Sequence, residues 1–115
     1  MQAKISKFSI FLFIALVGCS PKVVTFTQSD VDRASVKFPG ATTASLAEGK
    51  ELYKTHCQSC HLLKSVKSQS EDGWRKIVPG MVQGANKKAG KVVVDAVIEE
   101  KILAYLVTMS TAPAK

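Results

Sequence analysis

The sequence predicts a small all-α fold, on the basis of one long amphipathic segment, one capped helical segment and one possible strand that has no partner. From about Asp95 to Met109, apolar residues recur at helical intervals along one face. These residues are Ile98, Ile102, Tyr105, Leu106 and Met109. The β-branched run at 92–94 is a candidate strand, but no second strand is evident to pair with it. We therefore expect a helical domain over residues 45–110.

A second helix is expected to begin near Ser45, because Ser45 and Glu48 have the spacing of a capping box. Leu46, Gly49 and Tyr53 follow on one face of this helix. A glycine on that face permits the close approach of another helix, and an aromatic ring one turn later fills the space beside it. The helix is expected to run directly into the segment that begins at 57.

The middle of the domain is predicted to be a short helix between two loops. Residues 62–70 have little periodicity and are interpreted as a loop. Ser70 is a candidate N-cap, followed by two acids, for a helix that runs through Trp74 to Val78. Pro79-Gly80 is expected to break that helix, and the polar segment 83–91 is interpreted as loop.

The strongest functional signal is Cys57-Gln58-Ser59-Cys60-His61, which has the pattern of c-type haem attachment. Cys57 and Cys60 would each form a thioether to the haem, and His61 would be the proximal iron ligand. A structural zinc site fits less well, because it needs four converging ligands and no second ligand pair is present. A thioredoxin-type dithiol would follow a strand, whereas the residues before Cys57 have helical spacing.

The N-terminus reads as a targeting segment over residues 1–18. Lys4 and Lys7 precede a short apolar run, as in a signal peptide. The end of this run, at 16–19, resembles the lipobox of bacterial lipoproteins, which implies that Cys19 receives lipid and becomes the first mature residue. A plain signal peptide or an uncleaved anchor is the alternative. We expect an exported protein that is lipid-anchored to a membrane and faces the periplasm or the cell exterior.

Residues 19–44 are interpreted mainly as the lipidated N-terminus and a tether, because proline and glycine interrupt them and no helical period is sustained. A flexible coil of this length would have an r.m.s. reach of roughly 25 to 30 Å. Val31, Val36 and Phe38 are not needed in a tether, so partial order is expected from about Asp30.

The chain is basic, with 16 Lys and Arg against 9 Asp and Glu, and removal of the targeting segment leaves it so. Nucleic acid is not expected as a partner, because an exported protein rarely meets it and no aromatic residues interleave with the basic ones. An acidic redox partner is one interpretation, and ordinary solvated lysines are the other. The lysines concerned are Lys64, Lys67, Lys87, Lys88 and Lys91.

Over residues 43–110 the chain resembles a class I cytochrome c. In that family an N-terminal helix with a glycine and an aromatic residue four apart crosses a C-terminal helix with an aliphatic and an aromatic residue three apart. Gly49 and Tyr53 match the first pair, and Ile102 and Tyr105 match the second. More narrowly, the chain resembles small bacterial monohaem lipoproteins in the stretches 39–42, 46–53 and 74–81. The segment 84–95 departs from that pattern.

The resemblance implies a small helical domain wrapped around one covalent haem c, with Met81 as the distal iron ligand. Elimination also favours Met81, because His56 adjoins the attachment motif and Met109 ends the last helix. The expected function is single-electron transfer to and from redox partner proteins, without enzymatic chemistry. Two alternatives remain: a haem domain with an open sixth position that senses a gas or reduces peroxide, and a haem subunit of a larger oxidoreductase.

Overall fold

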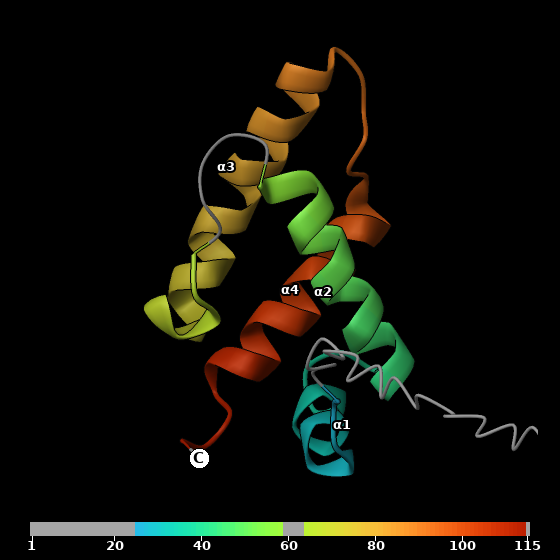
Figure 1. Ribbon diagram of the computed structural model, residues 1–115, viewed down its shortest axis with the longest axis vertical. Coiled ribbons are helices and arrows are strands. Elements are labelled where there is room, and N and C mark those ends of the chain that lie inside the picture. The colour runs from blue at the N-terminus through green and yellow to red at the C-terminus, as the bar shows by residue number, and fades with distance from the viewer. Residues whose placement is uncertain (1–24, 59–63, 115) are drawn as a thin grey trace, which may run out of the picture.

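The computed structural model describes residues 25–58 and 64–114, and within these ranges the fold is all-α (Figure 1). The helices in chain order are α1 (Gln28–Ser35), α2 (Thr43–Cys57), the 3₁₀ helix η1 (Val66–Ser68), α3 (Glu71–Ala89) and α4 (Ala96–Ser110). The described residues contain no strand, and 92–94 lies in the connection before α4. The predicted fold class is therefore confirmed at the level of an all-α domain.

The crossing of α2 over α4 is the centre of the fold (Figure 1). Gly49 lies at the point of closest approach: a Cβ atom placed on it would be 2.2 Å from the carbonyl oxygen of Lys101 and 3.0 Å from the Cβ of Tyr105. On the two crossing helices, Leu46 of α2 and Ile102 and Leu106 of α4 are fully buried. The expected close approach of two helices at Gly49 is confirmed.

The start of α2 differs from the prediction. Thr42 is the N-cap, with extended backbone, and its hydroxyl accepts a hydrogen bond of 3.0 Å from the Ser45 amide. The Ser45 hydroxyl in turn accepts one of 2.8 Å from the Thr42 amide, so the capping box joins Thr42 to Ser45. The box predicted between Ser45 and Glu48 was therefore wrong. Glu48 instead forms an ion pair of 2.7 Å with Lys101 of α4.

Helix α3 corrects the prediction of a break at Pro79-Gly80 and of a loop over 83–91. Its N-cap is Ser70, as expected, but the helix is continuous through Pro79 to Ala89. Pro79 is solvent-exposed, on the side where a helix tolerates the missing N–H and a bend. The helix ends at Gly90, whose φ of 68° is left-handed and favours glycine.

Helix α4 agrees with the predicted segment. Asp95 is its N-cap, and the Asp95 carboxylate accepts a hydrogen bond of 2.9 Å from the Ile98 amide. The helix ends at Ser110, one residue beyond Met109. Among the residues that the structure describes, no helix has the length and apolar character needed to cross a bilayer.

Residues 25–44, which the sequence assigned mainly to a tether, are folded against the domain. Phe26, Ala34 and Phe38 are buried, and the ring of Phe26 meets that of Tyr105 edge-on at 6.1 Å between centroids. Packed residues are therefore found as early as Phe26, before the predicted Asp30. The few apolar residues of this segment are enough to hold it on the domain. Helix α1 is short, and its inner face lies on α4 and on the first turn of α2.

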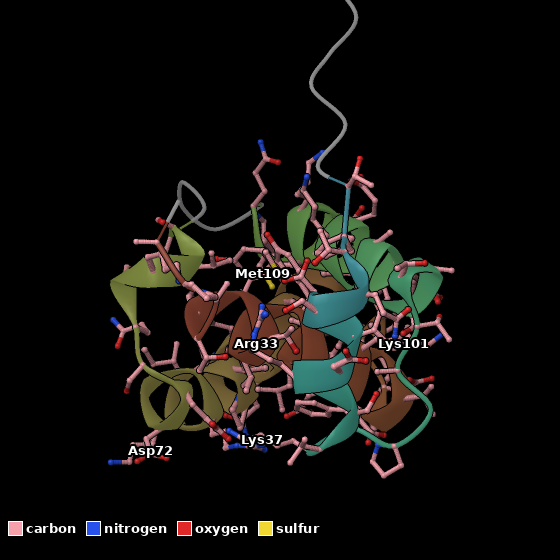
Figure 2. All side chains as sticks on the ribbon, turned by 90° about the horizontal axis from the view of Figure 1, so that it is seen from below. Arg33, Lys37, Asp72, Lys101 and Met109 are labelled. Atoms are coloured by element: carbon pink, nitrogen blue, oxygen red, sulfur yellow. The ribbon has the colours of Figure 1, made fainter. Side chains whose placement is uncertain are left out.

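A polar network fastens α1 to the end of α4, and its Arg33 lies near Met109 at that end (Figure 2). Asp30 accepts hydrogen bonds from the Thr27 amide at 2.8 Å and from the Arg33 guanidinium at 2.6 Å. Arg33 also reaches across to the carbonyl oxygen of Thr108, at 3.4 Å. Burial raises the pKa of Asp30, but the bonds from Thr27 and Arg33 outweigh burial and hold this pKa below its ordinary value.

We predict that Gly49→Ala destabilises the domain by about 1–3 kcal/mol, because the added methyl group forces α2 and α4 apart. Urea unfolding measures the effect. Gly84→Ala is the matched control, because Gly84 lies on an exposed part of α3 with nothing within 4 Å of an added Cβ. The control is expected to gain about 0.5–1 kcal/mol. Equal unfolding midpoints for the two variants would contradict the proposed role of Gly49.

A second prediction concerns acid stability. Because the pKa of Asp30 is lowered in the folded state, the unfolded chain takes up a proton first as the pH falls. Stability is thus expected to decrease below about pH 5, as the pH falls through the ordinary carboxyl pKa toward that of folded Asp30. Asp30→Asn should be less stable at neutral pH and show a shallower pH dependence in unfolding titrations. Parallel curves for the two proteins would show that Asp30 contributes nothing to the acid sensitivity.

Candidate functional site

The last residue of α2, Cys57, is directed into the core by the helix repeat. Leu46, Gly49, Tyr53 and Cys57 are separated by three or four residues, so they share the face that packs on α4. Cys57 is only 7% exposed and belongs to the main apolar cluster, together with Tyr53 and Trp74. The first cysteine of the attachment motif is therefore held at a fixed place at the edge of the core.

Three other predicted site residues lie outside the described ranges. Cys60 and His61, which complete the attachment motif, fall between residues 58 and 64. Cys19, the predicted lipidation site, precedes residue 25. Their roles stay predictions from the sequence.

Met81 lies on the inner face of α3, not in a loop. The stripe formed by Trp74, Val78, Met81 and Ala85 has offsets of four, seven and eleven residues and faces the core. Met81 is half-buried and packs against the same apolar cluster that contains Cys57. The structure thus brings together the thiol of Cys57 and the thioether of Met81 on one cluster, from two different helices.

A hollow of about 370 Å³ adjoins this cluster, between the end of α2 and the end of α3. It is lined by Thr55, His56, Ala85, Lys88, Ala89 and Val93, and we call it the α2–α3 hollow. Ala85 and Ala89 are one turn apart on α3, and their small side chains leave this space open. Neither Cys57 nor Met81 lines the hollow, but His56 precedes Cys57 on α2 and Ala85 follows Met81 by one turn on α3.

Two aromatic side chains hold the backbone of residues 64–66 in place. The Tyr53 hydroxyl donates a hydrogen bond of 3.0 Å to the Lys64 carbonyl, and the Trp74 indole donates one of 2.9 Å to the Val66 carbonyl. The two rings meet edge to face at 6.1 Å. Burial, and then the nearby Cys57, raise the pKa of Tyr53, so its hydroxyl stays a donor. The segment after the attachment motif is therefore tied to α2 and α3.

Lys67 ties the same segment to the end of α4. Its ammonium group donates to the carbonyl oxygen of Ser110 at 3.2 Å and also to that of Ala112. The Ser110 carbonyl is among those that a helix end leaves without intrahelical partners, and a cation satisfies it well. Lys67 thus has a structural contact in addition to its positive charge.

The five lysines singled out in the sequence do not all lie close together. Lys67 lies in η1, whose neighbour Val66 bonds to Trp74 near the start of α3. Lys87 and Lys88 lie in the last turn of α3, about 20 Å from Trp74 by helix rise. Lys88 lines the α2–α3 hollow, so the C-terminal end of α3 is where basic residues lie near the candidate site.

Asn86 is a residue that the sequence analysis missed. Its side-chain oxygen accepts hydrogen bonds from the Val93 and Val94 amides, at 2.8 and 2.9 Å. Its side-chain nitrogen donates one of 3.0 Å to the Val94 carbonyl. Asn86 therefore holds the connection before α4, which carries Val93 into the wall of the hollow. No local pattern signals this role, because the two partners are seven and eight residues away.

The described residues include two sulfur donors of the kind that a c-type haem would require. Cys57 supplies a buried thiol and Met81 a soft thioether, and Met81 packs against the apolar cluster to which Cys57 belongs. No protein family, curated protein or solved structure matches this chain.

We predict that Tyr53→Phe loosens the segment after the attachment motif, because the Lys64 carbonyl loses its donor. The expected loss of stability is about 0.5–1.5 kcal/mol. Faster amide hydrogen exchange over residues 64–68 should accompany it. Tyr105→Phe, which removes the same group from a neighbouring ring on α4, is the control and should leave this exchange unchanged. Unchanged exchange in Tyr53→Phe would exclude the anchoring role.

Proposed function

We propose that this protein is a single-electron carrier with one covalently attached haem c, held at a membrane surface by lipid on Cys19. The observation that carries the proposal is the Cys57-to-His61 motif at the end of a helix whose buried face directs Cys57 onto the cluster shared with Met81. The bound haem would supply the exchange of one electron between ferrous and ferric iron.

In this proposal Cys57 and Cys60 hold the group covalently. Each cysteine would hold the haem through one thioether, made by addition of its S–H across a vinyl group, so that no leaving group is needed. Because α2 fixes Cys57 at its last residue, the attachment point is rigidly connected to the α2–α4 crossing. Such rigidity suits a carrier, because electron transfer is favoured when little reorganises between the two oxidation states.

His61 and Met81 are the proposed axial ligands. Support for Met81 comes from its place on the stripe that leads to the α2–α3 hollow and from its packing on the cluster that contains Cys57. A thioether ligand raises the reduction potential and closes the sixth position. A closed position favours the carrier over the gas-sensing or peroxide-reducing alternative. A haem subunit of a larger oxidoreductase remains compatible with the same ligand set.

The surroundings of the proposed site suit electron transfer. Tyr53, Trp74 and Val78 give Cys57 an apolar environment of low dielectric, which disfavours the more highly charged oxidation state. Basic residues at the end of α3, among them Lys88, would favour an acidic contact surface on a redox partner. In this proposal the electron exchange takes place in the periplasm or at the cell exterior, which the signal and lipid motifs support.

The proposed ligand Met81 is testable by substitution. In Met81→Ala the ferrous protein should bind carbon monoxide and the reduction potential should fall, because the sixth position loses its thioether. Met109→Ala is the matched control, because Met109 of α4 packs against a different apolar cluster, which consists of Phe26, Ala34 and Leu46. Its spectrum and potential should stay those of the natural protein.

Two results would contradict the assignment. A ferrous spectrum and a potential unchanged in Met81→Ala would exclude Met81 as a ligand. Carbon monoxide binding to the unsubstituted ferrous protein would show an open sixth position and favour the ligand-binding alternative.

A separate prediction tests the anchor. Cys19→Ser should move the protein from the membrane fraction to the soluble fraction, because the acyl chains have no site of attachment. The helical content by circular dichroism should not change, since Cys19 precedes the folded domain. Mass spectrometry of the mature N-terminus is the direct measurement, and an unmodified Cys19 there would overturn the lipoprotein hypothesis.

A further inference from the structure

Helix α1 forms a clasp that begins only a few residues after the predicted lipidation site. Phe26 and Ala34 are buried with Leu46 of α2, and Arg33 bonds to the carbonyl oxygen of Thr108. The clasp therefore combines an apolar contact with α2 and α4 and a polar contact with the end of α4. The described residues from Phe26 onward belong to the domain.

The clasp shortens the leash between the lipid and the domain. Only six residues, 20–25, separate Cys19 from Phe26. A connection of this length spans at most about 25 Å when it is fully extended. A tether that ran to residue 44 would have more than three times that extended length. The length of the leash therefore depends on whether α1 is packed on the domain.

The distance from the clasp to the candidate site is set by α2. Leu46, which packs with Phe26, lies in the first turn of α2, and Cys57 is its last residue. At 1.5 Å of rise per residue, these two positions are about 17 Å apart along the helix. Together with the extended leash and a separation of about 8–10 Å between the packed segments, this means that Cys57 can lie no more than about 50 Å from the lipid surface.

We infer that α1 is a membrane-proximity clasp, which holds the domain against the lipid surface and restricts electron exchange to partners on the same membrane. The inference rests on the proposed lipid anchor and goes beyond it. A partner of this kind is an integral or lipid-anchored redox protein that presents its own centre within a few tens of ångströms of the bilayer. A freely diffusing partner needs no such restriction.

Neutron reflectometry of the full, lipidated chain on a supported phosphatidylethanolamine–phosphatidylglycerol bilayer tests this inference and needs no haem signal. The protein layer should end within about 55 Å of the headgroups, which is the extended leash plus one domain diameter. Insertion of twenty Gly and Ser residues between Val24 and Thr25 leaves the domain intact. It should raise the mean height by about 15 Å.

Release of the clasp should have nearly the same effect as the insertion. Phe26→Ser combined with Ala34→Asp removes the apolar contacts of α1 and should raise the layer by about 10–15 Å, because the leash then extends toward residue 41. Val36→Asp is the matched control, since Val36 is 81% exposed next to the same helix. It should leave the height unchanged.

The outcomes separate this inference from the proposed function. A natural chain whose layer is as broad as that of the insertion variant would overturn the clasp alone. So would an unchanged height in the clasp variant when hydrogen exchange shows that α1 has been released. If the clasp variant fails to fold, the insertion variant still decides the question. A chain without lipid on Cys19 would overturn the anchor and this inference together.

Discussion

The close approach of α2 and α4 at Gly49 is the contact on which the rest of the structure depends. No side chain fits at this position, because an added Cβ would lie 2.2 Å from the carbonyl oxygen of Lys101. The contact fixes the direction of α2 and therefore the place where its last residue, Cys57, meets the core. Tyr53, on the same face of α2, then contacts Trp74 and joins α3 to the crossing. The candidate site is thus a consequence of one helix crossing.

The regular parts of this fold were predictable because their signals are local. The apolar period of α4 is carried by its own residues, and Ser70 is the N-cap of α3 as the sequence indicated. Pro79 misled the prediction, because its effect depends on whether it lies on the buried or the exposed side of α3. The folding of α1 also escaped prediction, since Phe26 gains its stability from Tyr105, which is distant in sequence.

The candidate site was likewise predictable only where its signals are local. The attachment motif is a contiguous pattern and was evident from the sequence, as was Met81 through the resemblance to class I cytochromes c. The position of Met81 on a continuous helix, the hollow next to it and the bracing of Val94 by Asn86 depend on contacts between segments. Such contacts leave no local signature in the sequence. The sequence could therefore indicate candidate ligands, but not the residues that surround them.

The central claim is that Cys57 and Cys60 carry a covalent haem. The most direct measurement is haem staining of the purified chain after denaturing electrophoresis, following expression with a c-type maturation system. Stain that stays with the natural polypeptide and is lost in the Cys57→Ser, Cys60→Ser double variant is the result we predict. A folded natural chain that carries no haem through denaturation, or a double variant that retains it, would contradict the claim.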